Sequence, residues 1–195
     1  MKKHRVFIFA AISFVIVLSA VIFLQKNAAP TRLTTDEVAA LREQYPVCSG
    51  SPPLIETVPL SLADCAAMAD TFLYGKIEGE AQYFNQSTSD FYEYTLVILS
   101  DTSEKYEPGD RVTIAANVLF KDHNPQFQDG MRIVTPIRAD QNNASRTYFG
   151  TEGTYYVTPD GYAISAFEED AASYATAPSG LRVETLLEKL KEMQK

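Results

Sequence analysis

The sequence has no tryptophan and only two histidines and two cysteines among its 195 residues. His4 precedes a long apolar run, which leaves His123 as the single histidine of the remaining chain. Ser-His-Asp and Cys-His catalysis would both need that one side chain. His123 falls in the polar stretch "FKDHNPQFQDG", where a solvated histidine is the ordinary case. The scarcity of histidine therefore argues against both classes of enzyme.

Common catalytic patterns are also missing. There is no P-loop, no nucleophile elbow and no dinucleotide-binding glycine pattern. Asp122, His123 and Asp129 could hold a metal ion, but they lack the His-x-His or Glu-x-x-His spacing typical of such sites. Acidic pairs such as Glu168 and Glu169 are more typical of a solvated surface than of a glycosidase. We predict no catalytic residue, no metal site and no cofactor.

Charge is strongly one-sided outside the first residues. The chain has 17 Lys and Arg against 25 Asp and Glu. Without Lys2, Lys3 and Arg5 the balance is 14 against 25, a net charge of −11. Such a charge repels phosphate backbones and anionic lipids, so we predict that the chain binds no nucleic acid.

The first residues, "MKKHRVFIFAAISFVIVLSAVIFLQKN", combine basic side chains with an uncharged run. Residues 6–24, at about 1.5 Å each, come close to the roughly 30 Å of a bilayer core. The segment "KNAAP" is a poor signal-peptidase site. We therefore predict a retained signal anchor, a single transmembrane helix with the rest of the chain extracytoplasmic, because the basic flank stays inside. The alternative is secretion after cleavage.

Cys48 and Cys65 are the two cysteines of the part predicted to be exported. Two cysteines in an oxidising compartment most simply form one disulfide bond. Closing a loop of this size would stabilise the fold by roughly 3 kcal/mol. A thiol nucleophile or a metal site is the alternative, but there is no C-x-x-C pattern and no nearby histidine.

Two short helices are predicted before the pattern changes to strands. Thr34 precedes Glu37 by three residues, the spacing of a capping box, and this helix should end before Pro46. Ser61 is the expected N-cap of a second helix, with Asp64 near its positive end. The segments that follow are rich in aromatic and β-branched residues and alternate with period two, which predicts five or six strands. They read "TFLYGKIEGEAQYF", "DFYEYTLVILS", "RVTIAANVLF", "MRIVTPIRA" and "GTYYVTPDGYAISAF".

The final segment, "SGLRVETLLEKLKEM", places its apolar residues on one stripe and predicts a helix packed on the sheet. The fold class is therefore mainly β with flanking helices: a small antiparallel OB-like barrel or bent sheet with a C-terminal helix, preceded by a transmembrane helix. The domain organisation follows. Residues 1–26 form the anchor, residues 27–60 a helix and proline-rich arm, and residues 61–195 the extracytoplasmic β domain.

The runs "ADTFLYGKIEGEA", "YEYTLVILSDTSEKYEPGDRVTIAA" and "GTYYVTPDGYAIS", followed by "LLEKLK", resemble a group of Gram-positive cell-surface proteins of unknown function. The layout is also similar to the OB-like domain of the tissue inhibitors of metalloproteinases. Those inhibitors bind zinc through an N-terminal cysteine. Cys48 lies well inside this chain, so the resemblance implies a fold and not that activity.

The segment from Lys121 to Gly130 is the predicted binding site. Hairpin connections usually need about 2 to 5 residues, and this one is about twice as long. It groups His123, Asn124 and Phe127 with little alternation that would bury them. Surplus loop on a rigid sheet is a common place for recognition residues, and the alternatives are a decorative loop or an extension of the flanking strands.

These observations favour a membrane-anchored extracytoplasmic binding or interaction domain without catalytic activity. Its partner would be a protein or a component of the cell envelope. An inhibitor or regulator of an extracellular enzyme is the first alternative, and a hydrolase that uses carboxylates is the second. The sequence names neither ligand nor partner.

Overall fold

The structure of the chain is a computed structural model. Its compact unit spans Arg32–Lys195. None of the helices within the described residues is long and apolar enough to cross a membrane, and the predicted anchor at residues 1–26 lies outside them. The described residues are 30–48, 61–86, 89–118, 124–141, 146–150, 152–167 and 179–195.

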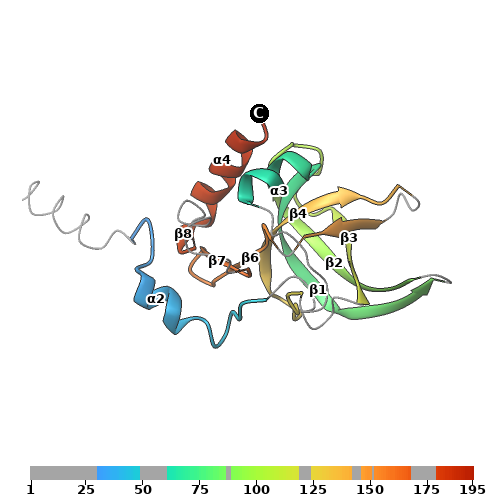
Figure 1. Cartoon of the computed structure of the whole chain (residues 1–195), viewed down its shortest axis with the longest axis horizontal. Coiled ribbons are helices and arrows are strands. Elements are labelled where there is room, and N and C mark those ends of the chain that lie inside the picture. The colour runs from blue at the N-terminus through green and yellow to red at the C-terminus, as the bar shows by residue number, and fades with distance from the viewer. Residues whose placement is uncertain are drawn as a thin grey trace, which may run out of the picture. The chain divides into compact units, whose positions relative to one another are not determined.

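Strands dominate the described part of the chain, and short helices flank them (Figure 1). In chain order the elements are α2 (Thr35–Ala40), α3 (Leu62–Met68), β1 (Thr71–Gln86), β2 (Ser89–Asp101), β3 (Arg111–Asn117), β4 (Arg132–Ala139), β5 (Arg146–Phe149), β6 (Tyr155–Val157), β7 (Tyr162–Ser165), β8 (Leu181–Arg182) and α4 (Val183–Met193).

Five strands close into a barrel in the order β1-β2-β3-β5-β4, and residues 71–76 of β1 complete the ring by pairing with β4. The prediction of a mainly β chain with a small barrel and a C-terminal helix is confirmed. The barrel was predicted as antiparallel, and one neighbouring pair of strands departs from this, because β3 and β5 run parallel. A ring with an odd number of strands cannot alternate direction at every neighbour, so one pair has to be parallel.

Strand β4 has a second role beyond the ring. Its first half pairs with β6, and β7 and β8 extend the sheet from there. Its second half pairs with β5. The change of partner falls at Pro136, which has no N–H to donate. A proline inside this strand is therefore accommodated where the ladder on one side is interrupted.

Alternating side chains divide the core into two clusters. The inner cluster fills the barrel and includes Leu73, Ile77, Leu96, Ile114 and Ile133. The outer cluster lies against the other face of β1, β4 and β6, under α3 and α4, and includes Leu62, Phe72, Val134, Leu186 and Leu190. Neighbouring residues of one strand, such as Ile133 and Val134, thus belong to different clusters because successive side chains point to opposite faces.

The helices follow the predicted signals. Thr34 and Glu37 form a capping box on α2, and Ser61 and Asp64 form another on α3. The helix α4 buries Val183, Leu186 and Leu190, so its predicted apolar stripe does pack on the sheet. Figure 1 shows α4 beside α3 and β8. The helix α2 ends at Ala40, before Pro46 as predicted.

The turn after β2 is organised around the carboxylate of Asp101, which is 9% exposed. This carboxylate accepts hydrogen bonds from the backbone N–H groups of Ser103 (3.0 Å), Lys105 (2.7 Å) and Tyr106 (2.9 Å) and from the hydroxyl of Thr71. Burial alone would raise the pKa of Asp101, but these donors stabilise the charged form and hold the pKa below its usual value.

The same turn contacts the end of α4. The hydroxyl of Thr102 donates to Oε1 of Gln194 at 2.6 Å, and Lys191 forms an ion pair with Glu104 at 2.6 Å. The ion pair is exposed and contributes little by itself. Together the contacts fix the turn against the C-terminal helix.

Replacing Asp101 by Asn should lower the free energy of unfolding at pH 7 by about 2–3 kcal/mol, because it removes a charged acceptor of several hydrogen bonds. A lowered pKa contributes stability above the unfolded value of about 3.9, and this is lost as the pH falls through the folded value. The difference between wild type and Asp101→Asn should therefore shrink below about pH 4. Urea titrations between pH 2 and 7 measure it.

Asp160→Asn in the exposed β6–β7 turn is the matched control and should differ little from wild type at any pH. A difference for Asp101→Asn that stays constant in acid would contradict the assigned role of its charge.

Candidate functional site

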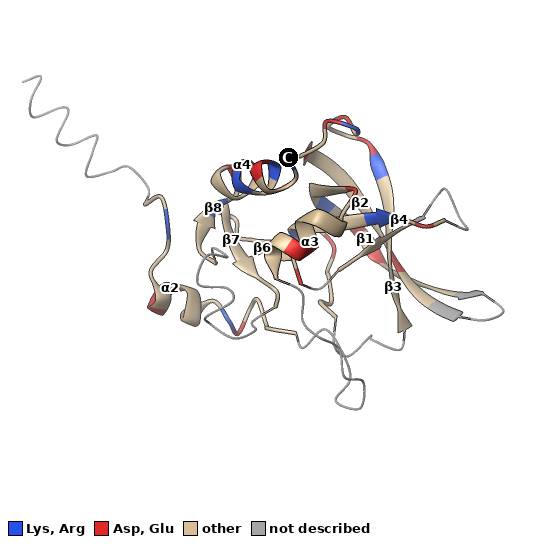
Figure 2. Ribbon diagram, turned by 45° about the horizontal axis from the view of Figure 1, so that its top comes forward, with Lys and Arg blue, Asp and Glu red and all other residues tan. Residues whose placement is uncertain are grey.

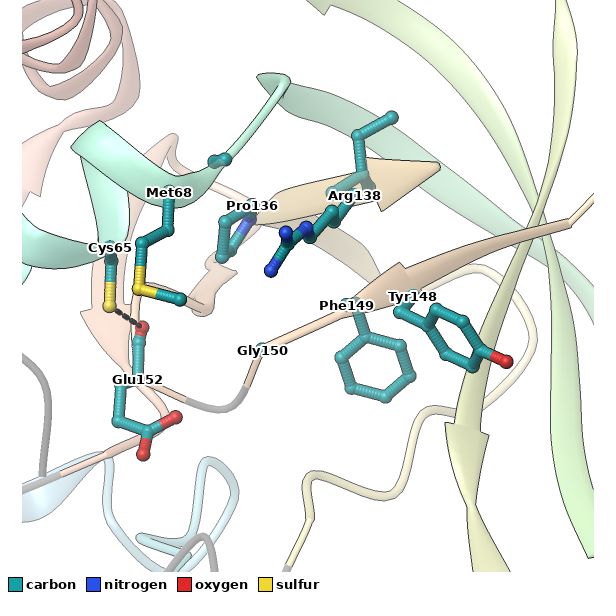
Figure 3. Close-up of a pocket in the computed structure, with 10 residues that line it drawn as sticks. Cys65, Met68, Pro136, Arg138, Tyr148, Phe149, Gly150 and Glu152 are labelled. Carbon is teal, nitrogen blue, oxygen red and sulfur yellow. Dashed lines mark hydrogen bonds between the residues drawn. The ribbon is translucent and has the colours of Figure 1, made fainter. Parts of the chain in front are cut away.

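An apolar pocket with a volume of about 200 Å³ lies between α3, the end of β4 and β5. Figure 3 shows side chains of α3 on one side of it and side chains of β4 and β5 on the other. Its lining residues are Cys65, Met68, Ala69, Pro136, Ile137, Arg138, Tyr148, Phe149, Gly150 and Glu152.

The helix α3 provides one wall. Its buried side, with Leu62, Cys65 and Ala66, packs into the outer cluster. Met68 is the last residue of the helix and stays 51% exposed at the pocket. Asp70 just beyond accepts a hydrogen bond from the backbone N–H of Ala139 at 2.7 Å. The helix end is thus attached to the end of β4, which fixes the width of the pocket.

The opposite wall is the paired end of β4 and β5. Pro136 contributes to this wall, and the segment that leaves β5 passes close to the proline ring. A Cβ atom on Gly153 would lie 3.0 Å from Cγ of Pro136, and the φ of Gly153 is +117°. Glycine is required here both by the close approach and by the backbone conformation. The close approach at Gly153 lets the segment after β5 pass directly against Pro136.

Polar groups stand at the mouth of the pocket. Arg138 and Tyr148 are direct partners across β4 and β5. The Tyr148 hydroxyl donates to the carboxylate of Asp140 at 3.2 Å, and its ring contacts Phe91. Arg138 is exposed, and among the described residues it has no carboxylate within ion-pair distance. The mouth therefore presents a guanidinium that can receive an acidic group.

Cys65 brings the one thiol among the lining residues of this pocket. Its thiol donates to the backbone carbonyl of Glu152 at 3.6 Å. Burial, with the negative charges of Glu152 and Asp64, raises the pKa of Cys65 to about 12. The thiol is consequently protonated at neutral pH and is a poor nucleophile or metal ligand.

The remaining chemistry of the described residues is that of a binding surface. No group of three or more His, Cys, Asp or Glu in the described part of the chain is placed to hold a metal ion. Both histidines lie outside the described residues. The pocket combines apolar walls with a cation at its mouth, an arrangement that can take an apolar group next to an acidic one.

No protein-family model and no curated protein matches this sequence. The resemblance to Gram-positive surface proteins therefore stays a prediction. The pocket has to be interpreted from its geometry.

The predicted Cys48–Cys65 disulfide is not formed, and both cysteines are free thiols. Cys65 belongs to the outer cluster, whereas the sulfur of Cys48 lies 4.0 Å from the hydroxyl of Tyr156 in the inner cluster. Tyr155 and Tyr156 point to opposite faces of β6, so the two sulfurs sit on opposite sides of the sheet. A direct bond would have to pass through it. The prediction rested on cysteine number and spacing, which carry no information about faces.

Thiol labelling checks this correction. Unfolding the full chain without reductant should expose both thiols to a thiolate-selective reagent. In the folded protein at pH 8, labelling should be much slower, because burial and the nearby carboxylates raise the pKa of Cys65 and keep its thiol protonated. Burial also raises the pKa of Cys48. Finding no reactive thiol after unfolding would instead demonstrate a disulfide.

The predicted binding segment is placed only in part. His123 lies outside the described residues. Asn124 is half-buried. Phe127 is 6% exposed and stands inside the barrel, with its ring centroid 5.1 Å from that of Tyr94 and 5.5 Å from that of Phe149. The premise that this segment lacks alternation is wrong, because Pro125 and Phe127 are buried while Gln126 is exposed.

A recognition role stays a prediction for His123 and Asn124, whereas Phe127 belongs to the core. The alternation of "NPQFQ" was the signal that could have shown this. Apart from Cys65, which was predicted only as a disulfide partner, the residues of the pocket were not predicted as site residues. The sequence signals that could have indicated the pocket were the proline inside a predicted strand and the nearby glycines of "FGTEG".

Phe127→Ala should lower the free energy of unfolding by about 3–5 kcal/mol, because it empties the centre of an aromatic cluster. The exposed neighbour in Gln126→Ala should cost no more than about 0.5 kcal/mol. Denaturant titration of both variants measures the difference. Equal stability of the two variants would show that Phe127 is not a core residue.

Proposed function

We propose that this protein is a membrane-anchored extracytoplasmic binding domain that holds a partner protein through the pocket between α3, β4 and β5. The observation that carries the proposal is the combination of an open apolar pocket with the exposed guanidinium of Arg138 at its mouth. The partner would insert an apolar side chain and place an acidic residue beside Arg138.

The size of the pocket supports a side chain as the occupant. Pockets for small molecules usually measure about 300–1,000 Å³, and this one has a volume of about 200 Å³. Met68 and the proline and phenylalanine of the strands offer apolar contact on three sides. Shallow apolar pockets that receive one anchor residue are typical of protein interfaces.

The topology of the barrel supports a binding function, because we propose that it is an OB fold. Its ring order, with parallel β3 and β5 and with β4 closing on β1, is the arrangement we propose to assign to that fold. OB folds often bind ligands with the connection between their fourth and fifth strands, and the pocket borders both strands. Because such folds serve many functions, the choice of partner rests on the pocket and not on the fold.

Charge supports a protein partner over a nucleic acid. The chain carries −8 overall, and basic residues on α4 alternate with acidic ones instead of forming a stripe (Figure 2). The acidic residues of α2 and α3 lie on the surface as well (Figure 2). A nucleic acid would meet repulsion over much of this surface.

The absence of catalysis is part of the proposal. The one thiol in the pocket is held protonated by burial and by two nearby carboxylates. The apolar run at residues 6–24 supports the anchor and the extracytoplasmic location. The domain would then display its pocket outside the membrane.

Site-specific photocrosslinking in native membranes tests the proposal. A photoreactive phenylalanine analogue replaces Met68 in the full chain. In the control chain the same analogue replaces Leu99, which is 42% exposed on β2. Position 68 should yield a discrete crosslinked protein that position 99 does not yield. Arg138→Glu in the same chain should reduce this product at least tenfold, because it places two acidic groups together.

Lys105→Glu changes the charge equally at another exposed position and should leave the product unchanged. A product of the same size at both positions, or one that is insensitive to Arg138→Glu, would reject the pocket as the binding site.

A further inference from the structure

A second cavity, of about 400 Å³, lies at the other end of β4 and shares no lining residue with the first pocket. It is bounded by the segment after α2, the segment before β4 and the β6–β7 turn. Gln44, Tyr45, Met131, Arg132 and Pro159 line it. Its volume falls in the range of about 300–1,000 Å³ that is usual for small-molecule sites.

Arg132 brings a positive charge to this cavity. It is the first residue of β4, and its Nη2 atom donates to the backbone carbonyl of Thr158. This bond uses one of the five N–H donors of a guanidinium. Within the described chain, no carboxylate lies within ion-pair distance of Arg132. Most of the donor capacity of this half-buried cation is therefore unused by the described residues.

A second cation stands next to Arg132 on the adjacent strand. Lys76 of β1 is its direct cross-strand partner. Like charges in this position repel each other. The stem of Lys76 passes over Gly130, which lines the cavity, since a Cβ atom there would lie 3.8 Å from Cε of Lys76. Lys76 is also near Glu78, but that carboxylate is held by Arg111 in an ion pair of 2.8 Å.

Tyr45 adds a neutral donor. The residue is 5% exposed, and its ring packs on Tyr156 at a centroid distance of 5.6 Å. Its hydroxyl has no hydrogen-bond partner among the described residues, although the residue lines the cavity. Burial raises the pKa of Tyr45, an effect that the positive charge of Arg132 partly offsets. The hydroxyl is therefore protonated at neutral pH and lies in the field of the guanidinium.

We propose that this cavity binds a small organic carboxylate with a compact apolar body. The planar guanidinium of Arg132 and the hydroxyl of Tyr45 would hold the carboxylate, since Arg matches the geometry of this group with two parallel hydrogen bonds. The Tyr45 ring, Met131, Val157 and Pro159 form the wall for the apolar body. The anion would also relieve the repulsion between Arg132 and Lys76. This site is independent of the partner pocket.

A purely structural role for Arg132 would need only the bond to the Thr158 carbonyl. Arg132→Lys retains a positive charge and one donor for that bond but loses the planar fork. Arg132→Lys therefore separates the two roles. If Arg132 only binds the Thr158 carbonyl, the protein should tolerate the change, whereas carboxylate binding should be weakened.

Isothermal titration calorimetry on the detergent-purified full chain at pH 7 tests the proposal, with benzoate as the probe. Benzamide has the same shape without the charge, and sulfate has charge without the apolar body. Benzoate should bind saturably, and the two controls should bind at least tenfold more weakly. Arg132→Gln and Arg132→Lys should each weaken benzoate at least tenfold, and Tyr45→Phe about threefold to tenfold.

Arg32→Gln removes an exposed guanidinium that lines neither cavity, and this matched control should leave benzoate affinity unchanged. If circular dichroism shows that Arg132→Gln does not fold, the benzoate affinities of Arg132→Lys and Tyr45→Phe test the proposal instead. The proposal is overturned if benzoate shows no saturable heat, if benzamide or sulfate binds as well as benzoate, or if both deciding variants bind like wild type.

Discussion

The pairing of β1 with β4 holds the architecture together. It spans residues 71–76 of β1 and turns a sheet with two open edges into a closed ring. Closure gives every strand of the ring an inner and an outer face, and it thereby separates the two core clusters. Because β4 also pairs with β5 and β6, one strand positions the barrel, the extension of the sheet and the two helices that cover it.

Both cavities border β4, at opposite ends of the strand. The pocket of the proposed partner site lies where the neighbour of β4 changes from β6 to β5, close to Pro136. The cavity of the proposed carboxylate site lies where β4 begins, at Arg132. Ladder hydrogen bonds join β4 to its neighbours, and these two openings lie at its start and at the change of partner. The topology of one strand thus accounts for the place of both sites.

Local signals were readable in the sequence, and relations across the sheet were not. The capping boxes of α2 and α3, the strand alternation and the apolar stripe of α4 act within a few residues, so a pattern reveals them. The parallel pairing of β3 and β5 follows only from the closed ring. The faces of the sheet on which Cys48 and Cys65 lie depend on the pairing register of the strands. The number of residues between the two cysteines does not determine that register. The partner pocket likewise joins three segments far apart in the chain, among them Met68 and Arg138.

The bond between Thr102 and Gln194 joins residues that are 92 positions apart. At synthesis rates of about 5–20 residues per second, roughly 5–20 s separate the emergence of the first from that of the second. Phe72 emerges before Thr102 and Val134 after it, and both precede α4, which helps to cover them, by about 50 residues or more. A nascent chain can therefore close its barrel while one apolar side is still bare, and this side is a natural target for a holding chaperone.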